Sequence, residues 1–223
     1  MTSLALLQLV SPALPVGAFS YSEGLEVLVQ AGALNDEACL EQWLRAELER
    51  GALRLEAAAL SELAVDLNRW VVAADPIACR RVLDLDGWLL ATREAAEVRA
   101  QQRQMGGSLL QLMADMGHPL PSPVALSWPA AWAWAATALE VPVKEMVEGY
   151  LYGWVANQLS AAVRLVPLGP SRAQVLQQRL LPLITEQAQG LVGQDPRQLW
   201  NGGVGASLAQ LAHAELYSRL FRS

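Results

Sequence analysis

The sequence of 223 residues is short of lysine, histidine and cysteine, and each shortage excludes a class of protein. Lys144 is the only lysine and the formal net charge is -6, so the chain lacks the basic surface with which proteins neutralise nucleic-acid phosphates. The cysteines, Cys39 and Cys79, form no CxxC pair, and the histidines, His118 and His213, form no HxxxH pair. The sequence therefore predicts no nucleic-acid binding, no disulfide framework and no metal site built by this chain alone.

Long uninterrupted apolar runs are also missing. Residues 1–22 carry no charged side chain, but they lack the basic start of a secretory signal, and Pro12 and Pro15 interrupt the apolar stretch. Prolines break the uncharged run 116–139 in the same way, which leaves no span of about 20 apolar residues to cross a bilayer. We therefore expect a soluble, cytoplasmic protein with no membrane-spanning helix.

The usual catalytic signatures are absent as well. The chain contains no GxxxxGK[ST] phosphate loop and no GxSxG nucleophile motif. The GGVG sequence at 202–205 follows no predicted strand, which argues against a dinucleotide site, and Asp84 with Asp86 does not complete the DDxxD pattern of prenyl-transfer enzymes. We expect a protein that acts by binding other proteins and is not an enzyme, with no cofactor bound by this chain alone.

What the sequence does contain is apolar side chains at helical spacing. Hydrophobic residues make up 53% of the chain and charged residues 17%, and no stretch alternates strictly between apolar and polar residues as a half-buried strand would. This pattern predicts an all-α fold with one domain over residues 1–223, a bundle of about eight to ten helices. The mean hydropathy of +0.22 and the 8 tryptophans indicate apolar surface that an oligomer or a complex would bury.

Capping and helix-breaking residues predict the helix boundaries. Ser20 followed by Glu23 has the spacing of a capping box, which predicts a helix over 21–32, and Asn35 is the expected cap of a helix that ends near Gly51. Further helices are expected over 53–73 and over 88–105, the second with a kink or stop at Gly106-Gly107. Between them, a helix is expected to start at the Asp75 cap and Pro76 and to break near 84–87. The remaining expected helices are one from Ser127, a long central helix from Pro142, one over 171–189 and a last helix that ends near Tyr217.

The end of the sequence, LYSRLFRS at 216–223, is unusual because chain ends are usually polar and dispensable. Tyr217 and Phe221 are aromatic, and Arg219 and Arg222 lie beside them. Burial of these aromatics needs a surface that receives them. The pattern leaves two alternatives open: the protein's own core, or a partner protein, for which Tyr and Arg are typical anchors.

Four segments resemble the UreF family of urease accessory proteins: SPALPVGAFSYSEGLE at 11–26, TREAAEVRAQQRQMG at 92–106, AAVRLVPLG at 161–169 and HAELYSRLFRS at 213–223. These motifs occur in the family's order across essentially the whole chain. The sequence departs from the family pattern at Glu23, where His, Asn or Gln is common, at residues 170–173, and at Ala214, where Glu is usual.

The resemblance implies a UreF-like, all-helical homodimer that acts as a chaperone-like factor in metallocentre assembly. Such a protein binds a second accessory protein, UreD (also called UreH), and recruits the GTPase UreG for nickel insertion into apo-urease. Nickel and GTP then belong to the partner complex. One alternative is a GTPase-activating role, in which Arg164 acts on UreG as an arginine finger. A weaker alternative is an enzyme with an apolar substrate among the Trp-rich helices.

The family motifs also indicate candidate partner-binding residues in this sequence. Phe19, Tyr21 and Glu26 lie in the first motif, where an aromatic beside a carboxylate suits contact with the GTPase or a nickel path. Arg164 ends the long central helix, where it is expected to pair with Glu26 or with a partner carboxylate. The residues expected to dock UreD are Tyr217, Arg219, Phe221 and Arg222. Arg93 and Arg103 of the second motif are expected to form interhelical ion pairs.

Overall fold

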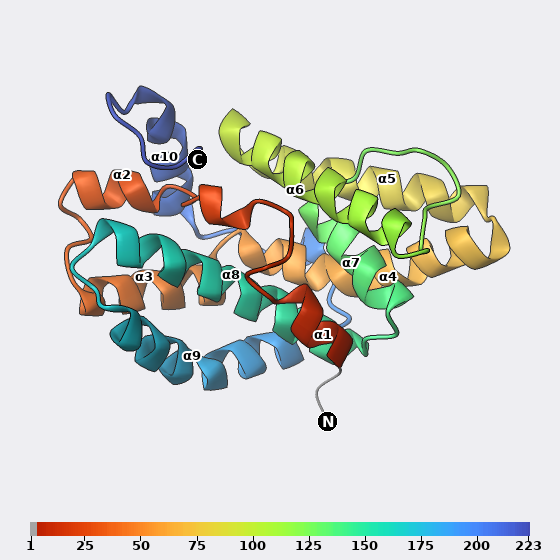
Figure 1. Cartoon of the computed structure of the whole chain (residues 1–223). Coiled ribbons are helices and arrows are strands. Elements are labelled where there is room, and N and C mark those ends of the chain that lie inside the picture. The colour runs from red at the N-terminus through yellow and green to blue at the C-terminus, as the bar shows by residue number, and fades with distance from the viewer. Residues whose placement is uncertain (1–3) are drawn as a thin grey trace.

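The computed structural model describes residues 4–223, and the regular elements in this part of the chain are all helical (Figure 1). The α-helices of the described residues are α1 (Leu4–Leu9), α2 (Leu25–Gln30), α3 (Glu37–Arg50), α4 (Leu53–Ala73), α5 (Pro76–Ala91), α6 (Ala96–Asp115), α7 (Trp128–Ala138), α8 (Val143–Leu165), α9 (Pro170–Leu191) and α10 (Val204–Ala212). Three short 3-10 turns accompany them: η1 (Ala18–Ser20), η2 (Pro196–Gln198) and η3 (His213–Glu215). The all-α prediction is confirmed.

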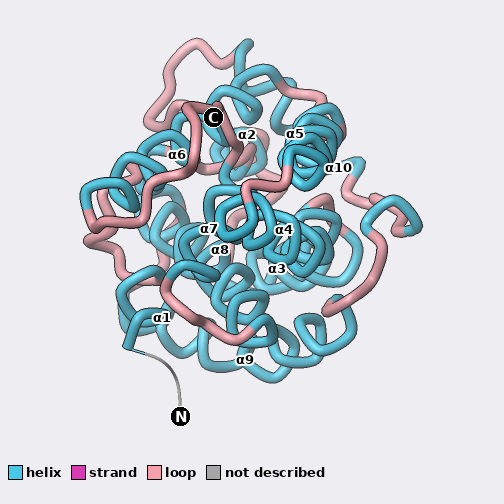
Figure 2. The backbone as a smooth tube through the Cα atoms, turned by 90° about the vertical axis from the view of Figure 1, so that its right-hand side faces the viewer, coloured by secondary structure: helices cyan, strands magenta, loops and turns pink. Residues whose placement is uncertain are grey.

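Helices α4, α7 and α8 form the centre of the molecule. α4 packs against α5, α7 and α8, α6 covers another side of α7, and α9 runs along α8. Viewed from the side, α4, α7 and α8 lie near the middle, with α1, α9, α6 and α5 around them (Figure 2). The helices α2 and α10 and the end of the chain lie together at one end of the molecule (Figure 1).

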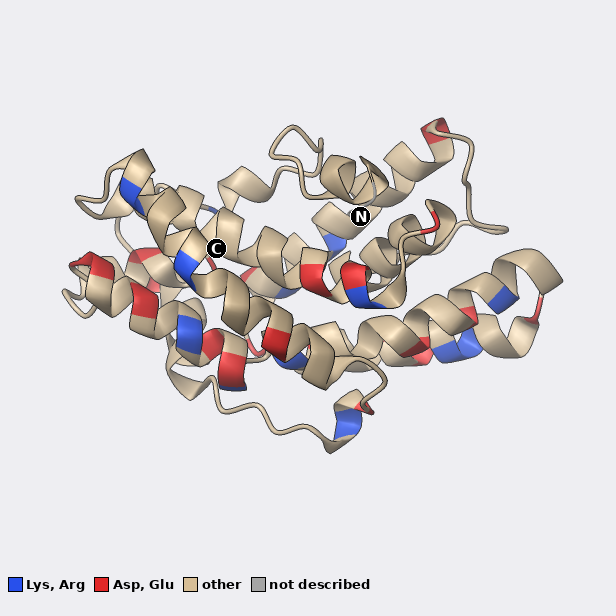
Figure 3. Cartoon of the chain, turned by 90° about the horizontal axis from the view of Figure 1, so that it is seen from below, with Lys and Arg blue, Asp and Glu red and all other residues tan. Residues whose placement is uncertain are grey.

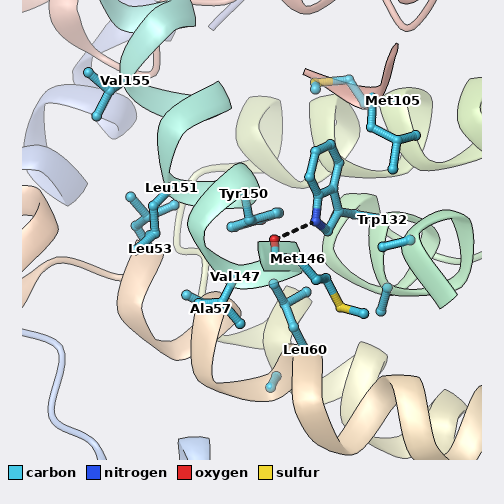
Figure 4. Close-up of a cluster of buried hydrophobic side chains, with 14 of the residues drawn as sticks. Leu53, Ala57, Leu60, Met105, Trp132, Met146, Val147, Tyr150, Leu151 and Val155 are labelled. Atoms are coloured by element: carbon cyan, nitrogen blue, oxygen red, sulfur yellow. Dashed lines mark hydrogen bonds between the residues drawn. The ribbon is translucent and has the colours of Figure 1, made fainter. Parts of the chain in front are cut away.

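The core is anchored by large side chains where these central helices meet (Figure 4). The Trp132 side chain of α7 is buried, and its Nε1 donates a hydrogen bond to the Met146 carbonyl oxygen of α8 at 3.1 Å. Its ring meets the Tyr150 ring edge-on, with centroids 5.9 Å apart. Leu60 of α4 is also fully buried in this cluster. The buried indole N–H therefore has an acceptor, as a stable core requires.

The position of α7 follows from its composition. The segment WPAAWAWAATA contains no charged residue, and residues 129–136 are all buried. A helix that is apolar on every face must be enclosed by other elements. This explains why α7 lies between α4 and α6 rather than on the surface.

The side-chain caps of α3 and α5 lie within one residue of their predicted positions. The Asp75 carboxylate accepts a hydrogen bond from the Ile77 backbone N–H at 2.8 Å, and Pro76 occupies the first turn of α5, as predicted. The cap of α3 is Asp36, whose carboxylate accepts from the Cys39 N–H at 2.8 Å, and not the neighbouring Asn35. Asn35 and Asp36 both have short side chains with an oxygen that can accept this hydrogen bond, which explains the one-residue error.

The helix predicted over 21–32 is shorter than expected. It starts at Leu25, because Glu23 and Gly24 both have positive φ angles, 50° and 88°. A Cβ at Gly24 would lie 2.9 Å from the backbone nitrogen of Gln210 in α10. The close approach of α10 therefore requires glycine here, and the Ser20–Glu23 capping box does not form.

Two predicted interruptions are also wrong. α5 continues through 84–87 to Ala91, and α6 continues through Gly106 and Gly107 to Asp115. Asp86 of α5 accepts a hydrogen bond from the Ser127 N–H at 2.9 Å, so its polarity serves a contact with the start of α7. Gly106 provides room for the same segment of chain.

The surface charges are mixed. Acidic and basic side chains alternate along the outer helices without a large area of one sign (Figure 3). Arg172 and Arg179 of α9 both reach Glu37 of α3, and Arg179 also reaches Glu41, so part of this pattern connects neighbouring helices. No helix within residues 4–223 combines the length and apolar character needed to cross a membrane.

Candidate functional site: the docked tail and the surface around it

Residues 216–223, here called the tail, fold back onto α2 through a buried carboxylate. Glu26 lies in the first turn of α2 and is 2% exposed. Its two oxygens accept hydrogen bonds from the backbone N–H groups of Leu220, at 2.7 Å, and Phe221, at 3.0 Å. Charge-assisted bonds of this kind are about twice as strong as neutral ones. Glu26 therefore fixes the backbone of the tail and does not face a partner.

The last residue is held equally firmly. A Ser223 backbone oxygen accepts from the N–H groups of Ser22 at 2.8 Å and Glu23 at 3.1 Å, and from the Ser22 hydroxyl at 2.8 Å. The Ser223 hydroxyl donates to the Gln101 Oε1 of α6 at 2.5 Å. Glu23 has a positive φ, and its N–H points toward this oxygen. The strained turn before α2 therefore helps to hold the end of the tail.

Phe221 is enclosed by the protein's own core. It is 4% exposed, and the guanidinium of Arg164 lies 4.4 Å from the centre of its ring. Arg164 also donates a hydrogen bond to the Phe19 carbonyl oxygen at 3.1 Å. The predicted Arg164–Glu26 ion pair is not formed, because tail N–H groups occupy both Glu26 oxygens and Arg164 lies against the other side of Phe221.

The remaining candidates separate into exposed and buried groups. Tyr217 is fully exposed, Phe19 is 69% exposed, and Arg222 also faces solvent. Arg219 is exposed but paired with Glu97 of α6 at 2.6 Å. Tyr21 is buried, and its hydroxyl donates to Gln104 at 2.9 Å. The sequence motifs thus contain both the side chains that anchor the tail and side chains that are available to a partner.

An apolar surface on α10 was missed by the sequence analysis. Val204, Leu208 and Leu211 are 61%, 61% and 46% exposed, and Trp200 just before the helix is 79% exposed. The spacing i, i+4, i+7 places the three aliphatic side chains on one helix face. That spacing was readable in the sequence, but it suits a core-facing helix equally well, and only the fold shows that the stripe points outward.

A network of buried polar side chains lies beneath the tail. Arg93, in the loop between α5 and α6, and Glu56 of α4 form an ion pair of 2.6 Å with both side chains almost fully buried. An ion pair was predicted for Arg93, but it joins a loop to a helix and not two helices. Tyr150 of α8 donates to the other Glu56 oxygen at 2.7 Å, and Gln102 of α6 donates to Glu56 at 3.1 Å. Arg103 is exposed and has no ion pair within residues 4–223. The network ties three helices together.

Burial changes the acidity of this network. Burial raises the pKa of Glu56, and the nearby Arg93 opposes the shift. Burial also raises the pKa of the neighbouring Glu47 to about 7, and the charge of Glu23 adds to that rise. Glu47 and Glu56 thus both lie near the buried Arg93, whose charge opposes the rise in their pKa that burial causes.

A cavity of about 370 Å³ opens beside the network, between the N-terminal segment, α6 and α8. Glu23 borders it, but its oxygens accept hydrogen bonds from Gln101 at 2.8 Å and from the Trp154 indole at 3.1 Å. Glu56 borders it as well and is paired with Arg93. Both carboxylates are therefore engaged in hydrogen bonds with other side chains of the protein. Among residues 4–223 no group of three or more His, Cys, Asp or Glu is arranged to hold a metal ion.

Fold and site together define an all-helical protein whose tail packs against its own helices. The exposed apolar side chains of α10 suit contact with another protein. Comparisons with known proteins are more specific. Residues 34–181 match the family model UreF. The chain is 40% identical over 219 residues to the urease accessory protein UreF of Prochlorococcus marinus subsp. pastoris, with 96% of each chain covered.

Two further relatives cover nearly the entire chain. The urease accessory proteins UreF of Thermosynechococcus vestitus and Microcystis aeruginosa are each 38% identical to it, over 226 and 229 residues, and in both cases 99% of this chain and 97% of the relative are covered. This chain belongs to the UreF family.

Proposed function

We propose that this protein is an adaptor in urease maturation, which acts by binding and not by catalysis. Its partners are UreD (UreH) and the GTPase UreG, and the assembly inserts nickel into apo-urease. Family membership over nearly the whole chain supports the role in maturation. The observation that supports an adaptor is the exposed apolar stripe of α10, because contiguous exposed apolar side chains mark protein-binding surfaces. Nickel is cargo in this proposal, and the setting is the cytoplasm.

The proposed UreD-docking surface combines this stripe with the exposed face of the tail. Leu208 and Leu211 supply aliphatic area, Tyr217 supplies an exposed aromatic anchor, and Leu220 is 52% exposed. Phe221, expected in this surface from the sequence, is left out because it is buried against Arg164. Arg219 contributes through its bond to Glu97, which fixes the position of the tail.

Co-expression with UreD and UreG tests the adaptor role. We expect a ternary complex with the wild-type chain, and loss of UreD from it for Leu208→Asp or Tyr217→Ala, because each removes apolar contact area without touching the core. Val72→Asp is the matched control: Val72 is 77% exposed but lies on α4, and binding should be unchanged. Failure of both partners to associate with the wild type in any nucleotide state would refute the proposal.

Recruitment of UreG is assigned to Phe19 and to Arg222 of the tail, which are both exposed. Arg222, expected from the sequence to dock UreD, is thus moved to the UreG surface because it lies beside Phe19. Arg222 donates its backbone N–H to the Ser20 carbonyl at 2.9 Å, so the two side chains belong to one rigid unit. Arg164 positions this unit through Phe19 and Phe221. An arginine finger would have to leave both contacts. We therefore expect Arg164→Ala to weaken UreG binding, with the rate of GTP hydrolysis in the residual complex unchanged. A drop of about 10³-fold or more in that rate would support the finger instead.

The homodimer implied by the family stays a prediction. Exposed apolar residues of α1, Leu4 and Leu7, provide area that a second copy could cover. Sedimentation equilibrium of the isolated chain, and of the complex with UreD, measures the stoichiometry directly. A monomeric isolated chain at all concentrations, together with a single copy of this chain in the UreD complex, would contradict the dimer.

A further inference from the structure

The cavity of about 370 Å³ beside the buried network is lined by apolar and aromatic side chains together with a set of carboxamides. The carboxamides are those of Gln101, Gln102, Asn157, Gln174 and Gln177. Among residues 4–223, no arginine, lysine or histidine lines this cavity. Its two carboxylates, Glu23 and Glu56, already accept hydrogen bonds from other side chains. The lining therefore suits a ligand that carries no charge.

Two of these carboxamides are buried with one polar atom left over. Gln102 is 4% exposed and Gln177 is 6% exposed. The Gln102 Oε1, an acceptor, and the Gln177 Nε2, a donor, have no hydrogen-bond partner within residues 4–223. A buried polar atom without a partner is costly, so native structures contain few of them. A peptide group would suit such carboxamides, because it offers one N–H donor and one carbonyl acceptor.

Gly153 adds an independent observation, because it lies within α8, where glycine disfavours the helix. Four residues earlier, packing explains Gly149: a Cβ there would lie 2.5 Å from the Leu6 Cδ1. A Cβ at position 153 would meet nothing within 4 Å, and Gly153 lines the cavity. A glycine that no neighbouring atom requires is explained if a ligand approaches the α8 backbone closely.

The cavity continues as a groove between α8 and α9. A second hollow extends from it to Arg164, whose side chain already contacts Phe19 and Phe221. The lining residues that both hollows share are Ala156, Ser160 and Gln174. Together the two hollows, here called the α8 groove, follow the helix from Tyr150 to Arg164, which is about 20 Å at 1.5 Å per residue. An extended peptide of about six residues has this length.

We propose that the α8 groove binds an extended, uncharged, apolar segment of a partner protein. Apolar side chains of the segment enter the aromatic part of the cavity, its peptide groups pair with the carboxamides, and its backbone passes over Gly153. Phe19, to which recruitment of UreG is assigned above, also lines the cavity, so the segment is assigned to the partner that docks there. Only this last assignment rests on the proposed function.

The test of peptide binding uses the full chain without partners. The probe is an acetylated, amidated hexapeptide in which leucine and serine alternate, and isothermal titration calorimetry measures its dissociation constant. We expect it to bind. Replacement of one central leucine by aspartate or by lysine should weaken binding by about tenfold or more, because the charge would lose water without gaining a partner.

Variants of the chain separate binding from folding. Gly153→Leu should weaken peptide binding by about tenfold or more without lowering the midpoint of thermal unfolding, because leucine favours a helix more than glycine does. Gly107→Leu is the matched control: a Cβ at position 107 also meets nothing within 4 Å, but Gly107 does not line the cavity, and binding should be unchanged. Gln177→Leu removes the unpartnered donor, and should weaken binding while the fold is kept.

The outcomes distinguish this proposal from the proposed function. No binding of the probe by the wild type, equal binding of charged and uncharged peptides, or unchanged binding by Gly153→Leu would overturn the peptide groove. In co-expression with UreD and UreG, Gly153→Leu should retain UreD and weaken retention of UreG. Normal retention of UreG by this variant would overturn the assignment of the segment to UreG. The adaptor role itself fails only if the wild type retains neither partner.

Discussion

Gly106 and Gly107 are adjacent in α6 but have opposite surroundings. A Cβ at position 106 would lie 2.7 Å from the Ser127 carbonyl carbon, a backbone atom that has no room to move aside, whereas a Cβ at position 107 meets nothing within 4 Å. We expect Gly106→Ala to reduce the free energy of unfolding by about 1–3 kcal/mol through overpacking. Gly107→Ala should increase it by up to about 1 kcal/mol, because glycine costs backbone entropy inside a helix. Urea denaturation of both variants measures the contrast, and equal effects would contradict it.

Glu47 gives a residue-level prediction about pH. Burial raises its pKa to about 7, above the value in the unfolded chain, so the folded state holds the proton more tightly. Its contribution to stability is therefore fully present at acidic pH, declines as the pH rises through the interval between the two pKa values, and is lost above about pH 7.

Replacing Glu47 by glutamine removes this titration. We expect Glu47→Gln to gain on the order of 3 kcal/mol relative to the wild type between about pH 4.5 and about pH 8, measured as the difference in the free energy of unfolding at the two pH values. Glu49→Gln, an exposed position two residues away in the same helix, serves as the control and should show no such gain. A pH-independent difference between Glu47→Gln and the wild type would contradict the assignment.

At the scale of elements, the tail contains two aromatics with different roles. Phe221 is 4% exposed and packs under Arg164, whereas the Tyr217 side chain is fully exposed. Phe221→Ala should release the tail, because truncation of a buried Phe costs about 3–5 kcal/mol. Rapid hydrogen exchange over residues 216–223, with the helical circular dichroism nearly unchanged, is the expected result. Tyr217→Ala should leave exchange as in the wild type. Slow exchange in Phe221→Ala would show that the polar contacts of the tail hold it without the Phe221 ring.

At the scale of the whole molecule, the Arg93–Glu56 pair connects helices that are distant in sequence. Glu56 lies in α4, Tyr150 in α8 and Gln102 in α6, and all three converge on this pair. Arg93→Ala leaves the buried Glu56 charge without its cation, so we expect a loss of about 3–5 kcal/mol in the global free energy of unfolding. Arg45→Ala, which breaks an exposed ion pair within α3, should cost less than about 1 kcal/mol. Chemical denaturation followed by fluorescence measures both.

Much of the fold was predictable because it depends on local interactions. The Asp75 cap and Pro76 at the start of α5, and the proline in the first turn of α7, act within one helical turn. The errors share a physical cause. Gly106 and Asp86 lie where the sequence predicted helix breaks, and Gly24 lies where it predicted an uninterrupted helix, but each residue makes a contact with a segment distant in the sequence.

The candidate site divides in the same way. The sequence by itself determined the all-helical class, the family motifs and the choice of an aromatic, cationic tail as a special feature. Only the tertiary structure decided that Phe221 faces inward and Tyr217 outward, and that Glu26 binds backbone N–H groups instead of Arg164. Helix formation depends on neighbours within a few residues. Which side chains of the tail are buried depends instead on surfaces that are distant in the sequence, such as Glu26, which lies 194 residues before Leu220.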